Sequence, residues 1–403
     1  MKILILSSVF SPNIFGGGEV VAYNMAKLLV RRGHDVSVAT SLEENESHTW
    51  GERTKEGYKL YRIPIQRNHT TFGRTKNSIP SWKKIIWHGQ DYFDSYNAKI
   101  ISKLLKDVNP DHVDIHSIIG IGFNILSEIN KCNVSVVYFL HDLNLACFHG
   151  PMFKNGQNCK KQCKPCQLTG YLRQRELQKV SKLGFISPSQ TNLNNIIPFA
   201  SVVKDSPHKV VRNVPDDLPN LPKRESSKEL RLIYVGRLEA IKGINFLLET
   251  LSQLDNKDNF HLTILGTGSL EEVLRTKYEA NSWVTFKGFV KQSDVPIAIS
   301  QSDLFCMSSL WSETYGLVTA QALQIGIPVI GSNIGGTTEL VRNNETGLLL
   351  PPGDKKAWGD AFQMILEQPD ILDKWRINTE IHKEEFDANK LGAEYEEFIA
   401  TLN

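Results

Sequence analysis

Short apolar runs rich in β-branched residues alternate along the chain with longer stretches in which apolar residues recur every three or four positions. The first run, residues 2–7, is followed by a helical pattern over residues 19–31. Further strand-like runs in the first half occupy residues 35–40, 134–140, 184–187 and 209–212. Such alternation is typical of a parallel sheet with helices on both faces, so the pattern predicts an α/β fold.

The alternation stops between residues 213 and 229, where Pro215, Pro219 and Pro222 stand among polar residues. It then resumes with strand-like runs at residues 230–235, 261–265, 283–286, 304–307 and 328–330 and helical patterns near residues 244–254 and from residue 270. We therefore expect two doubly wound domains, residues 1–213 and 230–380, joined by a linker at 214–229 and followed by a charged helix at 381–403. Ligands of such sheets bind at the carboxyl ends of the strands, so the expected site is the cleft between the domains.

The composition excludes several classes of protein. The chain has 403 residues, of which 41% are apolar, and can fill two hydrophobic cores. No apolar run approaches the roughly 18 residues that cross a bilayer, and the amino-terminal run is too short for a secretory signal, so we expect a cytoplasmic protein. The net charge of +2 hides an asymmetry, because residues 1–200 contain 25 Lys and Arg against 15 Asp and Glu, and the remainder contains 21 against 29.

Three consecutive glycines, Gly16, Gly17 and Gly18, stand between the first strand and the helix that follows it. Such a turn lets a ligand approach the backbone and aims helix amides at anionic or hydroxyl groups, although an ordinary strand-to-helix turn would look the same. The stretch is not a Gly-x-Gly-x-x-Gly fingerprint, and the stretch that begins at Gly266 also lacks the third glycine. A nicotinamide-dependent oxidoreductase is thus disfavoured.

A loop after the first strand of the second domain carries two cations. Arg237 and Lys242 lie five residues apart on a stretch bounded by Gly236 and Gly243. Cations on such a loop at the carboxyl end of a strand suit a diphosphate, because each charge-assisted hydrogen bond is worth roughly 1.5 to 3 kcal/mol. A solvated loop with two ordinary surface cations is the alternative.

A third segment places Glu313 before a predicted helix start at Gly316, with Gln321 on that helix. If the helix begins there, its free amides near Leu317 and Val318 point toward a ligand, and Gln321 lies roughly 7.5 Å beyond its start. One end of this segment suits a sugar, the middle suits a diphosphate, and the far end suits a ribose. Glu313 as the cap of the helix is the alternative.

Together and in this order, these segments resemble the GT-B glycosyltransferases of family 4, also called glycosyl transferases group 1. The resemblance also includes His141 after a strand, the apolar run at 327–330 and the Asn-Glu-Thr-Gly-Leu-Leu segment at 344–349, so it covers nearly the whole chain. It implies two Rossmann-like doubly wound domains that face each other across a cleft, with the C-terminal helix returning to the N-terminal domain.

The resemblance also assigns roles to residues. It implies that the C-terminal domain binds a nucleotide-sugar donor, with Arg237 and Lys242 on the diphosphate and the catalytic Glu313 on the sugar hydroxyls. His141 would contact the sugar from the N-terminal domain, and a purely structural histidine is the alternative. The family usually has a second Glu that binds both ribose hydroxyls where this chain has Gln321. An amide in place of a carboxylate predicts donor binding weaker by about 1 to 2 kcal/mol.

Transfer with retention of anomeric configuration is the reaction that the resemblance implies. The chain contains no Asp-x-Asp motif, so we expect catalysis without a metal ion or cofactor, the leaving phosphate being stabilised by Arg237, Lys242 and the helix amides. In the family, that phosphate takes the proton of the acceptor hydroxyl from the same face. A non-enzymatic nucleotide-sugar-binding relative is the first alternative, because of Gln321, and the oxidoreductase is the second.

Four of the six cysteines gather shortly after His141, at Cys147, Cys159, Cys163 and Cys166. In a reducing compartment this spacing, with its Cys-x2-Cys element, predicts a structural zinc ion that would fold the polar insert at residues 147–170. Free thiols and an iron-sulfur or redox role are the alternatives.

The excess positive charge of the first half gathers in two segments. Residues 154–182 carry eight Lys and Arg against Glu176 alone, and residues 74–87 place Arg74, Lys76, Lys83 and Lys84 beside Trp82 and Trp87. Such segments suit an anionic membrane surface, and a solvated face is the alternative. We expect a glycan acceptor on a lipid carrier at the inner membrane face, in cell-surface polysaccharide synthesis. No helix-turn-helix, zinc-finger or RNP pattern supports nucleic-acid binding.

Overall fold

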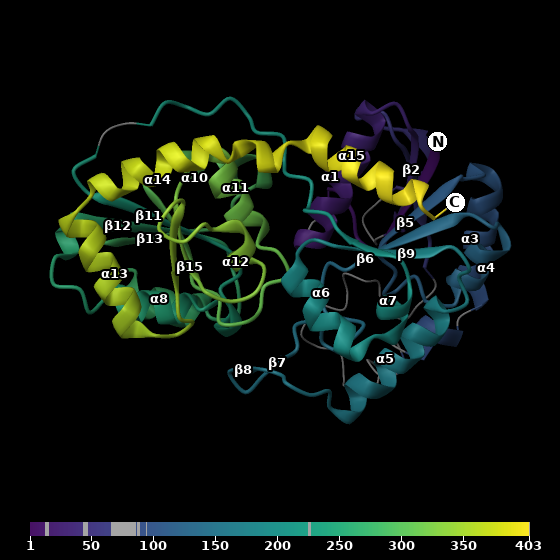
Figure 1. Ribbon diagram of the computed structural model, residues 1–403, viewed down its shortest axis with the longest axis horizontal. Coiled ribbons are helices and arrows are strands. Elements are labelled where there is room, and N and C mark those ends of the chain that lie inside the picture. The colour runs from purple at the N-terminus through teal and green to yellow at the C-terminus, as the bar shows by residue number, and fades with distance from the viewer. Residues whose placement is uncertain are drawn as a thin grey trace. The chain divides into compact units, whose positions relative to one another are not determined.

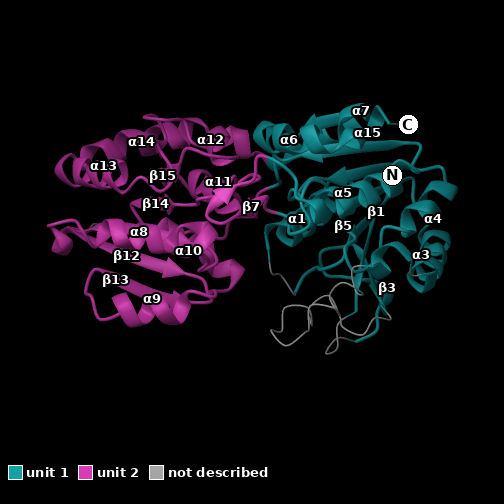
Figure 2. Cartoon of the chain, turned by 90° about the horizontal axis from the view of Figure 1, so that it is seen from below, with its two compact units in different colours: residues 1–150, 161–214, 388–403 teal, residues 151–160, 215–387 magenta. Residues whose placement is uncertain are grey.

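The computed structural model describes residues 1–12, 16–42, 47–65, 86, 89–93, 95–224 and 227–402. The chain divides into two compact units, shown in teal and magenta in Figure 2. Unit 1 comprises residues 1–150, 161–214 and 388–403, and unit 2 comprises residues 151–160 and 215–387. The long segment of unit 2 therefore starts at Pro215, inside the stretch that the sequence marks as a linker.

Unit 1 is built on an eight-stranded sheet with the strand order β10-β9-β6-β5-β1-β2-β4-β3. All neighbouring pairs are parallel except β3 and β4. The strands are β1 (Lys2–Ser7), β2 (Asp35–Ser41), β3 (Trp50–Arg53), β4 (Lys59–Ile63), β5 (His112–Ser117), β6 (Ser135–Phe139), β9 (Leu183–Ser187) and β10 (His208–Val210). The five strands predicted in this half are confirmed, and the structure adds β3, β4 and β5.

The helices of unit 1 include one from the end of the chain. Those with described bounds are α1 (Gly17–Arg31), α3 (Ser95–Val108), α4 (Ile125–Lys131), α5 (Lys164–Leu177), α6 (Gln190–Ile196), α7 (Ser201–Asp205) and α15 (Ala388–Ala400). Figure 1 shows α15, in yellow, beside α1. The Tyr395 hydroxyl donates to Asp114 of β5 at 2.7 Å, and Glu396 accepts from Nε and Nη2 of Arg32 at 2.7 and 2.6 Å. These contacts join the end of the chain to unit 1.

The expected C-terminal helix over residues 381–403 is wrong in its start. Helix α14 (Asp370–Ile381) ends where it was expected to begin, a 3-10 turn follows at Lys383–Phe386, and α15 starts at Ala388. The break has a packing reason. Phe386 is buried in a core of unit 2, whereas Leu391 and Tyr395 are buried in a core of unit 1.

Unit 2 is built on a six-stranded sheet in which every neighbouring pair is parallel, with the order β13-β12-β11-β14-β15-β16. The strands are β11 (Leu230–Val235), β12 (Phe260–Leu265), β13 (Val284–Gly288), β14 (Leu304–Met307), β15 (Val329–Ser332) and β16 (Gly347–Leu350). The five predicted strands are confirmed, and β16 is added. The strand order reverses between β11 and β14, so the carboxyl ends of these two strands form the point at which such sheets bind ligands.

Helices cover both faces of this second sheet. They are α8 (Ile244–Leu251), α9 (Glu271–Tyr278), α10 (Val295–Ser300), α11 (Leu317–Ile325), α12 (Thr337–Leu340), α13 (Lys355–Glu367) and α14. Successive residues of β11 point to opposite faces. Leu232 and Tyr234 pack in the core that contains α8 and α13, and Ile233 packs in the core that contains α10 and α11. Burial on both faces explains why this strand is a continuous apolar run.

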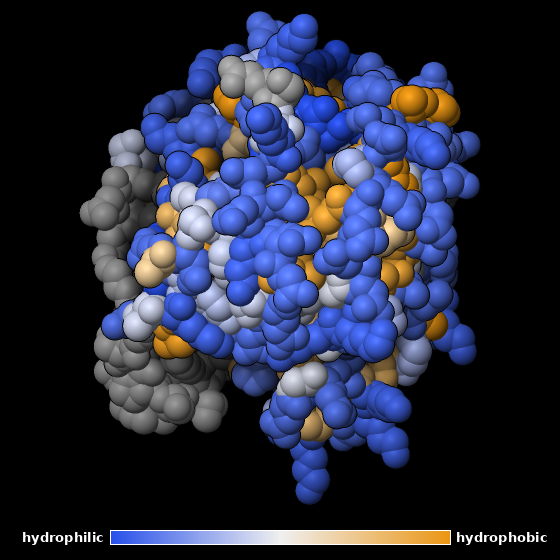
Figure 3. Space-filling model, turned by 90° about the vertical axis from the view of Figure 1, so that its left-hand side faces the viewer, coloured by the Kyte–Doolittle hydropathy of each residue, from blue (hydrophilic) through white to orange (hydrophobic). Residues whose placement is uncertain are grey.

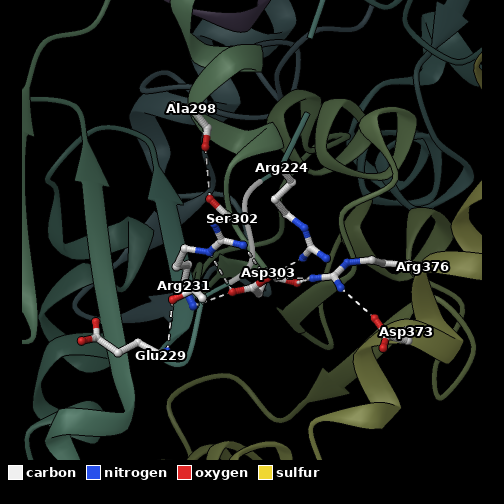
Figure 4. A network of polar contacts seen from close by, with 9 residues as sticks. Arg224, Glu229, Arg231, Ala298, Ser302, Asp303, Asp373 and Arg376 are labelled. Carbon is white, nitrogen blue, oxygen red and sulfur yellow. Dashed lines mark hydrogen bonds and ion pairs between the residues drawn. The ribbon is translucent and has the colours of Figure 1, made fainter. Parts of the chain in front are cut away.

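An ion-pair network lies at the amino-terminal edge of this sheet (Figure 4). The carboxylate of Asp303, which directly precedes β14, lies 2.5 Å from Arg224, 3.1 Å from Arg231 of β11 and 3.0 Å from Arg376 of α14. Burial by itself would raise the pKa of Asp303, but the hydrogen bonds and charges of the arginines outweigh it and lower the pKa. The network ties the linker, the sheet and α14 together.

The face of the molecule shown in Figure 3 is largely hydrophilic, with apolar residues visible between polar ones. Scattered apolar residues are normal on a protein surface. Across the part of the chain that the structure describes, no helix combines the length and the apolar character that a membrane crossing requires.

Candidate active site

Two loops of unit 2 meet where the strand order of its sheet reverses. Residues 236–242 follow β11, and residues 308–316 follow β14. Gly243 permits the close approach of these loops, because it has a φ of 68° and a Cβ atom there would lie 1.9 Å from the carbonyl oxygen of Ser308. The Ser308 hydroxyl in turn donates to the Lys242 carbonyl at 3.2 Å. Any other residue at position 243 would force the loops apart.

The carboxylate of Glu313 lies at the centre of this region. Its Oε1 is 2.7 Å from Nζ of Lys242, and it also accepts from Trp311 Nε1 at 2.8 Å and Ser309 Oγ at 2.5 Å. Only 6% of Glu313 is exposed. Three donors on one buried oxygen fix the orientation of the side chain. Glu313 therefore does not act as a helix cap, and Lys242 is not an ordinary surface cation.

The backbone of Glu313 is held by a glycine turn that the sequence analysis did not single out. A Cβ atom at Gly335 would lie 2.4 Å from the Glu313 nitrogen, and the Gly336 amide donates to the Glu313 carbonyl at 2.7 Å. The signal was present in the sequence, because paired glycines shortly after a strand mark a close backbone approach.

Helix α11 begins next to Glu313. Its N-cap is Gly316, with a φ of 98°, and no side chain of the described residues caps this end by a hydrogen bond. The first amides of a helix have no partners within the helix and carry its positive dipole end, so those of Leu317 and Val318 suit an anion. The hydroxyl of Thr319 is buried without a hydrogen-bond partner among the described residues. The helix thus starts where the sequence analysis expected it.

The two cations of the first loop differ in their surroundings. The side chain of Lys242 is 19% exposed and its ammonium lies 5.2 Å from the centroid of the Trp311 ring, whereas Arg237 is exposed. The Arg237 carbonyl accepts from the Tyr234 hydroxyl at 3.0 Å. Burial, followed by the charge of Glu313, raises the pKa of Tyr234, so this phenol stays neutral and its hydrogen bond is kept.

Gln321 contacts the carboxylate of Asp216, which was not predicted as a site residue. Its Nε2 donates to Oδ2 of Asp216 at 3.2 Å, and Nε2 of Gln292 donates to both carboxylate oxygens of Asp216 at 3.1 and 3.2 Å. Asp216 belongs to the linker and Gln321 to α11, 105 positions later. No local sequence pattern connects residues so far apart.

In unit 1, His141 follows β6 and pairs with His116 of β5. Nδ1 of His116 lies 2.7 Å from Nε2 of His141, and the rings stack with centroids 4.9 Å apart. Burial lowers the pKa of His141 to about 4, so the ring is neutral at neutral pH. A Cβ atom at Gly18 would lie 3.5 Å from the His141 ring. The glycine turn, of which Gly16 and Gly17 are exposed, therefore adjoins this histidine.

The pairing favours one position for the proton of His141. Nε2 of His116 is buried without a hydrogen-bond partner among the described residues. Buried N–H groups without partners are rarer than unpaired acceptors, so we assign the proton of His116 to Nδ1, from which it donates to His141. His141 then carries its own proton on Nδ1.

Comparison with known protein families gives two matches. The description Glycosyltransferase Family 4 matches residues 15–161, and Glycosyl transferases group 1 matches residues 220–382. Together they span more than half of the chain. This chain belongs to the family 4 glycosyltransferases. The oxidoreductase alternative is therefore set aside.

Relatives of this glycosyltransferase resemble it along most or all of its length. An uncharacterized 42.6 kDa protein in the cps region of Klebsiella pneumoniae is 25% identical over 351 residues, which cover 85% of this chain and 88% of that protein. Sucrose-phosphate synthase from Thermosynechococcus elongatus has a TM-score of 0.76 at 19% identity over 99% of each chain. Anabaena HepE, solved in complex with UDP-glucose, has a TM-score of 0.70 at 19% identity over 100% of each chain. The fold is thus GT-B, with two Rossmann-like domains.

Three of the four clustered cysteines of this glycosyltransferase lie together in unit 1. Sγ of Cys166 is 3.4 Å from that of Cys163 and 3.9 Å from that of Cys147, while Cys159 is in the segment assigned to unit 2. Among the described residues, no group of three or more His, Cys, Asp and Glu side chains is arranged to hold a metal ion. Zinc binding stays a prediction. Burial above all raises the pKa of the Cys166 thiol to about 11.

A hairpin from the Cys-rich insert contacts the Glu313 loop. It consists of β7 (Phe153–Lys154) and β8 (Gln157–Asn158) and groups with unit 2 (Figure 2). The side chain of Asn158 accepts from the Ser312 amide at 3.0 Å and donates to the Leu310 carbonyl at 3.4 Å. This hairpin was not predicted, although an Asn-Gly pair such as that at its turn, residues 155–156, is the strongest short-range sequence signal for a β-hairpin.

The structure describes only part of the two predicted basic segments. Arg74, Lys76, Trp82, Lys83, Lys84 and Trp87 lie outside the described residues. Within residues 154–182, Arg173 is only 2% exposed and donates to the carbonyls of Asn144 and Cys147, so it does not add to a surface charge. The remaining cations of that segment that follow residue 160 belong to unit 1.

Proposed function

We propose that this glycosyltransferase moves a sugar from a nucleotide-sugar donor to a glycan acceptor in cell-surface polysaccharide synthesis, with retention of anomeric configuration. The observation that carries the proposal is the pairing of Lys242 with Glu313 beside the amino-terminal end of α11. The cation and the helix amides suit a diphosphate, and the carboxylate suits the hydroxyls of a sugar. The complex of HepE with UDP-glucose makes a UDP-sugar the first candidate donor.

The donor diphosphate in this proposal is held without a metal ion. Arg237, Lys242 and the amides of Leu317 and Val318 supply positive charge at the carboxyl edge of the sheet, and each charge-assisted bond contributes roughly 1.5 to 3 kcal/mol. The absence of an Asp-x-Asp motif from the sequence agrees with this arrangement. We expect full activity in excess EDTA.

The proposed transfer is a same-face substitution. The bond between the anomeric carbon and the phosphate oxygen breaks, and the acceptor hydroxyl oxygen bonds to that carbon from the same face. The proton of that hydroxyl passes to the departing phosphate. Glu313 orients the sugar through its hydroxyls, and the neutral ring of His141 donates a hydrogen bond to a sugar hydroxyl. The donor diphosphate thus replaces a protein base.

The acceptor in this proposal is carried on a lipid, and one face of α5 supports that choice. Leu168 and Tyr171 are 61% and 63% exposed, and they share a helix face with the exposed cations Lys164 and Arg175. Apolar side chains between cations suit an anionic lipid surface. We expect the protein to sediment with phosphatidylglycerol vesicles at low salt, and Leu168→Ser/Tyr171→Ser to weaken this binding. Failure to bind these vesicles would contradict the proposed association with a membrane.

One experiment tests the donor and the reaction together. Thermal unfolding is measured with UDP-, GDP-, ADP- and dTDP-sugars, and the sugar that raises the unfolding temperature is then followed by NMR as it is transferred or hydrolysed. Retention predicts that the product keeps the anomeric configuration of the donor. Stabilisation without turnover would favour the non-enzymatic alternative that Gln321 suggests, and no stabilisation by any of the four would contradict the proposal.

A further inference from the structure

We infer that Asp216 supplies the carboxylate that binds the ribose hydroxyls of the donor, in partnership with Gln321. The inference rests on the proposed function and adds to it a residue from the linker. It addresses the departure at position 321, where the resemblance leads one to expect a charged side chain and the chain has an amide.

The carboxylate of Asp216 is held by two side-chain amides from separate elements. Gln321 of α11 donates to Oδ2 at 3.2 Å. Gln292, from the turn that follows β13, donates to Oδ1 and Oδ2 at 3.1 and 3.2 Å. These two contacts orient the carboxylate of Asp216 beside the side chain of Gln321.

The location along α11 agrees with this role. Gln321 lies four residues after Leu317, hence on the same helix face and about 6 Å further from the amino-terminal end. The diphosphate in the proposed function lies at that end, and a ribose is joined to its diphosphate through a single methylene. Gln321 is buried, with 8% exposed, whereas Asp216 keeps part of its surface exposed.

Each hydroxyl of a ribose diol can donate one hydrogen bond, so two acceptors satisfy the pair. The amide of Gln321 has a single acceptor oxygen, because its nitrogen is a donor and is directed at Asp216. The carboxylate of Asp216 supplies the missing acceptor and the charge, which strengthens a hydrogen bond relative to a neutral acceptor. The substitution at position 321 therefore moves the negative charge to a neighbouring residue and does not remove it.

This arrangement predicts that the usual family residue fails in this chain. A glutamate at position 321 would place two carboxylates at the present separation of 3.2 Å without a proton donor between them. Like charges that close repel, and one of them takes up a proton or moves away. Exchanging the two residue types, with Gln321→Glu and Asp216→Asn together, restores a donor facing an acceptor.

Dissociation constants for UDP and 2′,3′-dideoxyuridine diphosphate test the inference by titration calorimetry. We expect the unmodified protein to bind UDP at least about tenfold more tightly than the dideoxy analogue, since two hydrogen bonds to the diol are lost. Asp216→Asn should weaken UDP binding about tenfold and change binding of the analogue less than about twofold. Gln321→Glu alone should also weaken UDP binding, and the double variant should return it to within about threefold of the unmodified protein.

Asp217→Asn, which changes the neighbouring carboxylate, is the matched control and should leave both constants unchanged, while thermal unfolding of every variant checks the fold. Two results would overturn the inference and leave the proposed function standing: undiminished preference for UDP in Asp216→Asn, or tighter UDP binding by Gln321→Glu alone. Equal binding of UDP and the analogue by the unmodified protein would do the same. Absence of binding to UDP, GDP and ADP alike would contradict the proposed function itself.

Discussion

The ammonium of Lys242 and the carboxylate of Glu313 lie 2.7 Å apart, on the two loops that follow β11 and β14. Each side chain holds the other in place. Less side-chain conformational entropy is therefore lost when a nucleotide-sugar donor binds beside them. The same pairing is a reason to expect that changing either residue alters both ends of the donor site.

Replacing Glu313 tests its place in the reaction. Glu313→Ala removes the group proposed to orient the sugar and leaves Lys242 without its partner, so we expect the turnover number to fall at least about 100-fold. Initial rates of transfer or of donor hydrolysis measure the effect. Glu272→Ala, an exposed carboxylate on α9, is the control and should retain normal rates. Near-normal turnover by Glu313→Ala would refute the assignment.

His116 is expected to act through His141. His116→Phe keeps a flat ring on Phe139, which stacks on His116 with centroids 4.1 Å apart, but removes the hydrogen bond that sets the proton position of His141. We expect kcat/KM to fall about tenfold, the equivalent of one hydrogen bond, without loss of thermal stability. A lower unfolding temperature with unchanged kcat/KM would show that His116 is only structural.

The ion pair between Arg32 and Glu396 makes the stability of unit 1 depend on pH. Hydrogen bonds from Arg32, which outweigh burial, lower the pKa of Glu396 from its ordinary value of 4.5 to about 2. A lowered pKa in the folded state means that the stabilisation is complete above about pH 4.5 and is lost as the pH falls toward 2. Glu396→Gln should therefore cost about 2 kcal/mol at pH 7 and almost nothing near pH 2, as urea unfolding at both values would measure. An equal cost at both values would contradict the linkage.

Asp303 should matter for stability and not for donor binding. Asp303→Asn removes the shared partner of three arginines, and uncompensated, partly buried cations are destabilising by about 3 kcal/mol. Because the network lies at the opposite edge of the sheet from the Glu313 loop, UDP affinity should be unchanged in the folded variant. Asp373→Asn, whose side chain is 74% exposed beside Arg376, is the matched control and should cost less than about 0.5 kcal/mol. Equal effects of the two variants would contradict the special role of Asp303.

Metal analysis decides the prediction for the cysteine cluster. Protein purified without chelator should contain close to one zinc per chain, removal of the metal should lower the unfolding temperature, and Cys163→Ser should reduce the zinc content. Less than about 0.2 zinc per chain would refute the prediction and favour free thiols.

The sequence was most informative where burial on both faces leaves a continuous apolar run. Strands β11 and β14 were predicted with the bounds that the structure has, and the loops after them follow directly. Strand β5 was missed because His112 and Asp114 interrupt its apolar pattern, and their partners come from elsewhere. Asp114 accepts from Tyr395, which lies 281 positions later in the chain. A polar residue that is satisfied only by a distant segment carries no local signal.

The same limit applied at the candidate site. Lys242 and Glu313 were identified from motifs, because each lies on a loop at a strand end with glycines nearby. Asp216 and His116 were not, since a carboxylate in a proline-rich linker and a histidine inside a strand look ordinary in sequence. Their significance comes only from the side chains that the fold brings next to them.

The end of the chain is part of the first unit, not an appendage to the second. The side chain of Leu402 lies so close to Gly184 of β9 that a Cβ atom there would be 2.8 Å from it, and Phe398 would be 3.0 Å away. A chimera that exchanges unit 2 between relatives would therefore have to replace two internal segments, residues 151–160 and 215–387, and keep the rest of the recipient chain. Recombination with a single crossover in the linker would instead combine the first part of unit 1 from one protein with helix α15 from the other. The packing of α15 would then depend on how well the surfaces of the two proteins match.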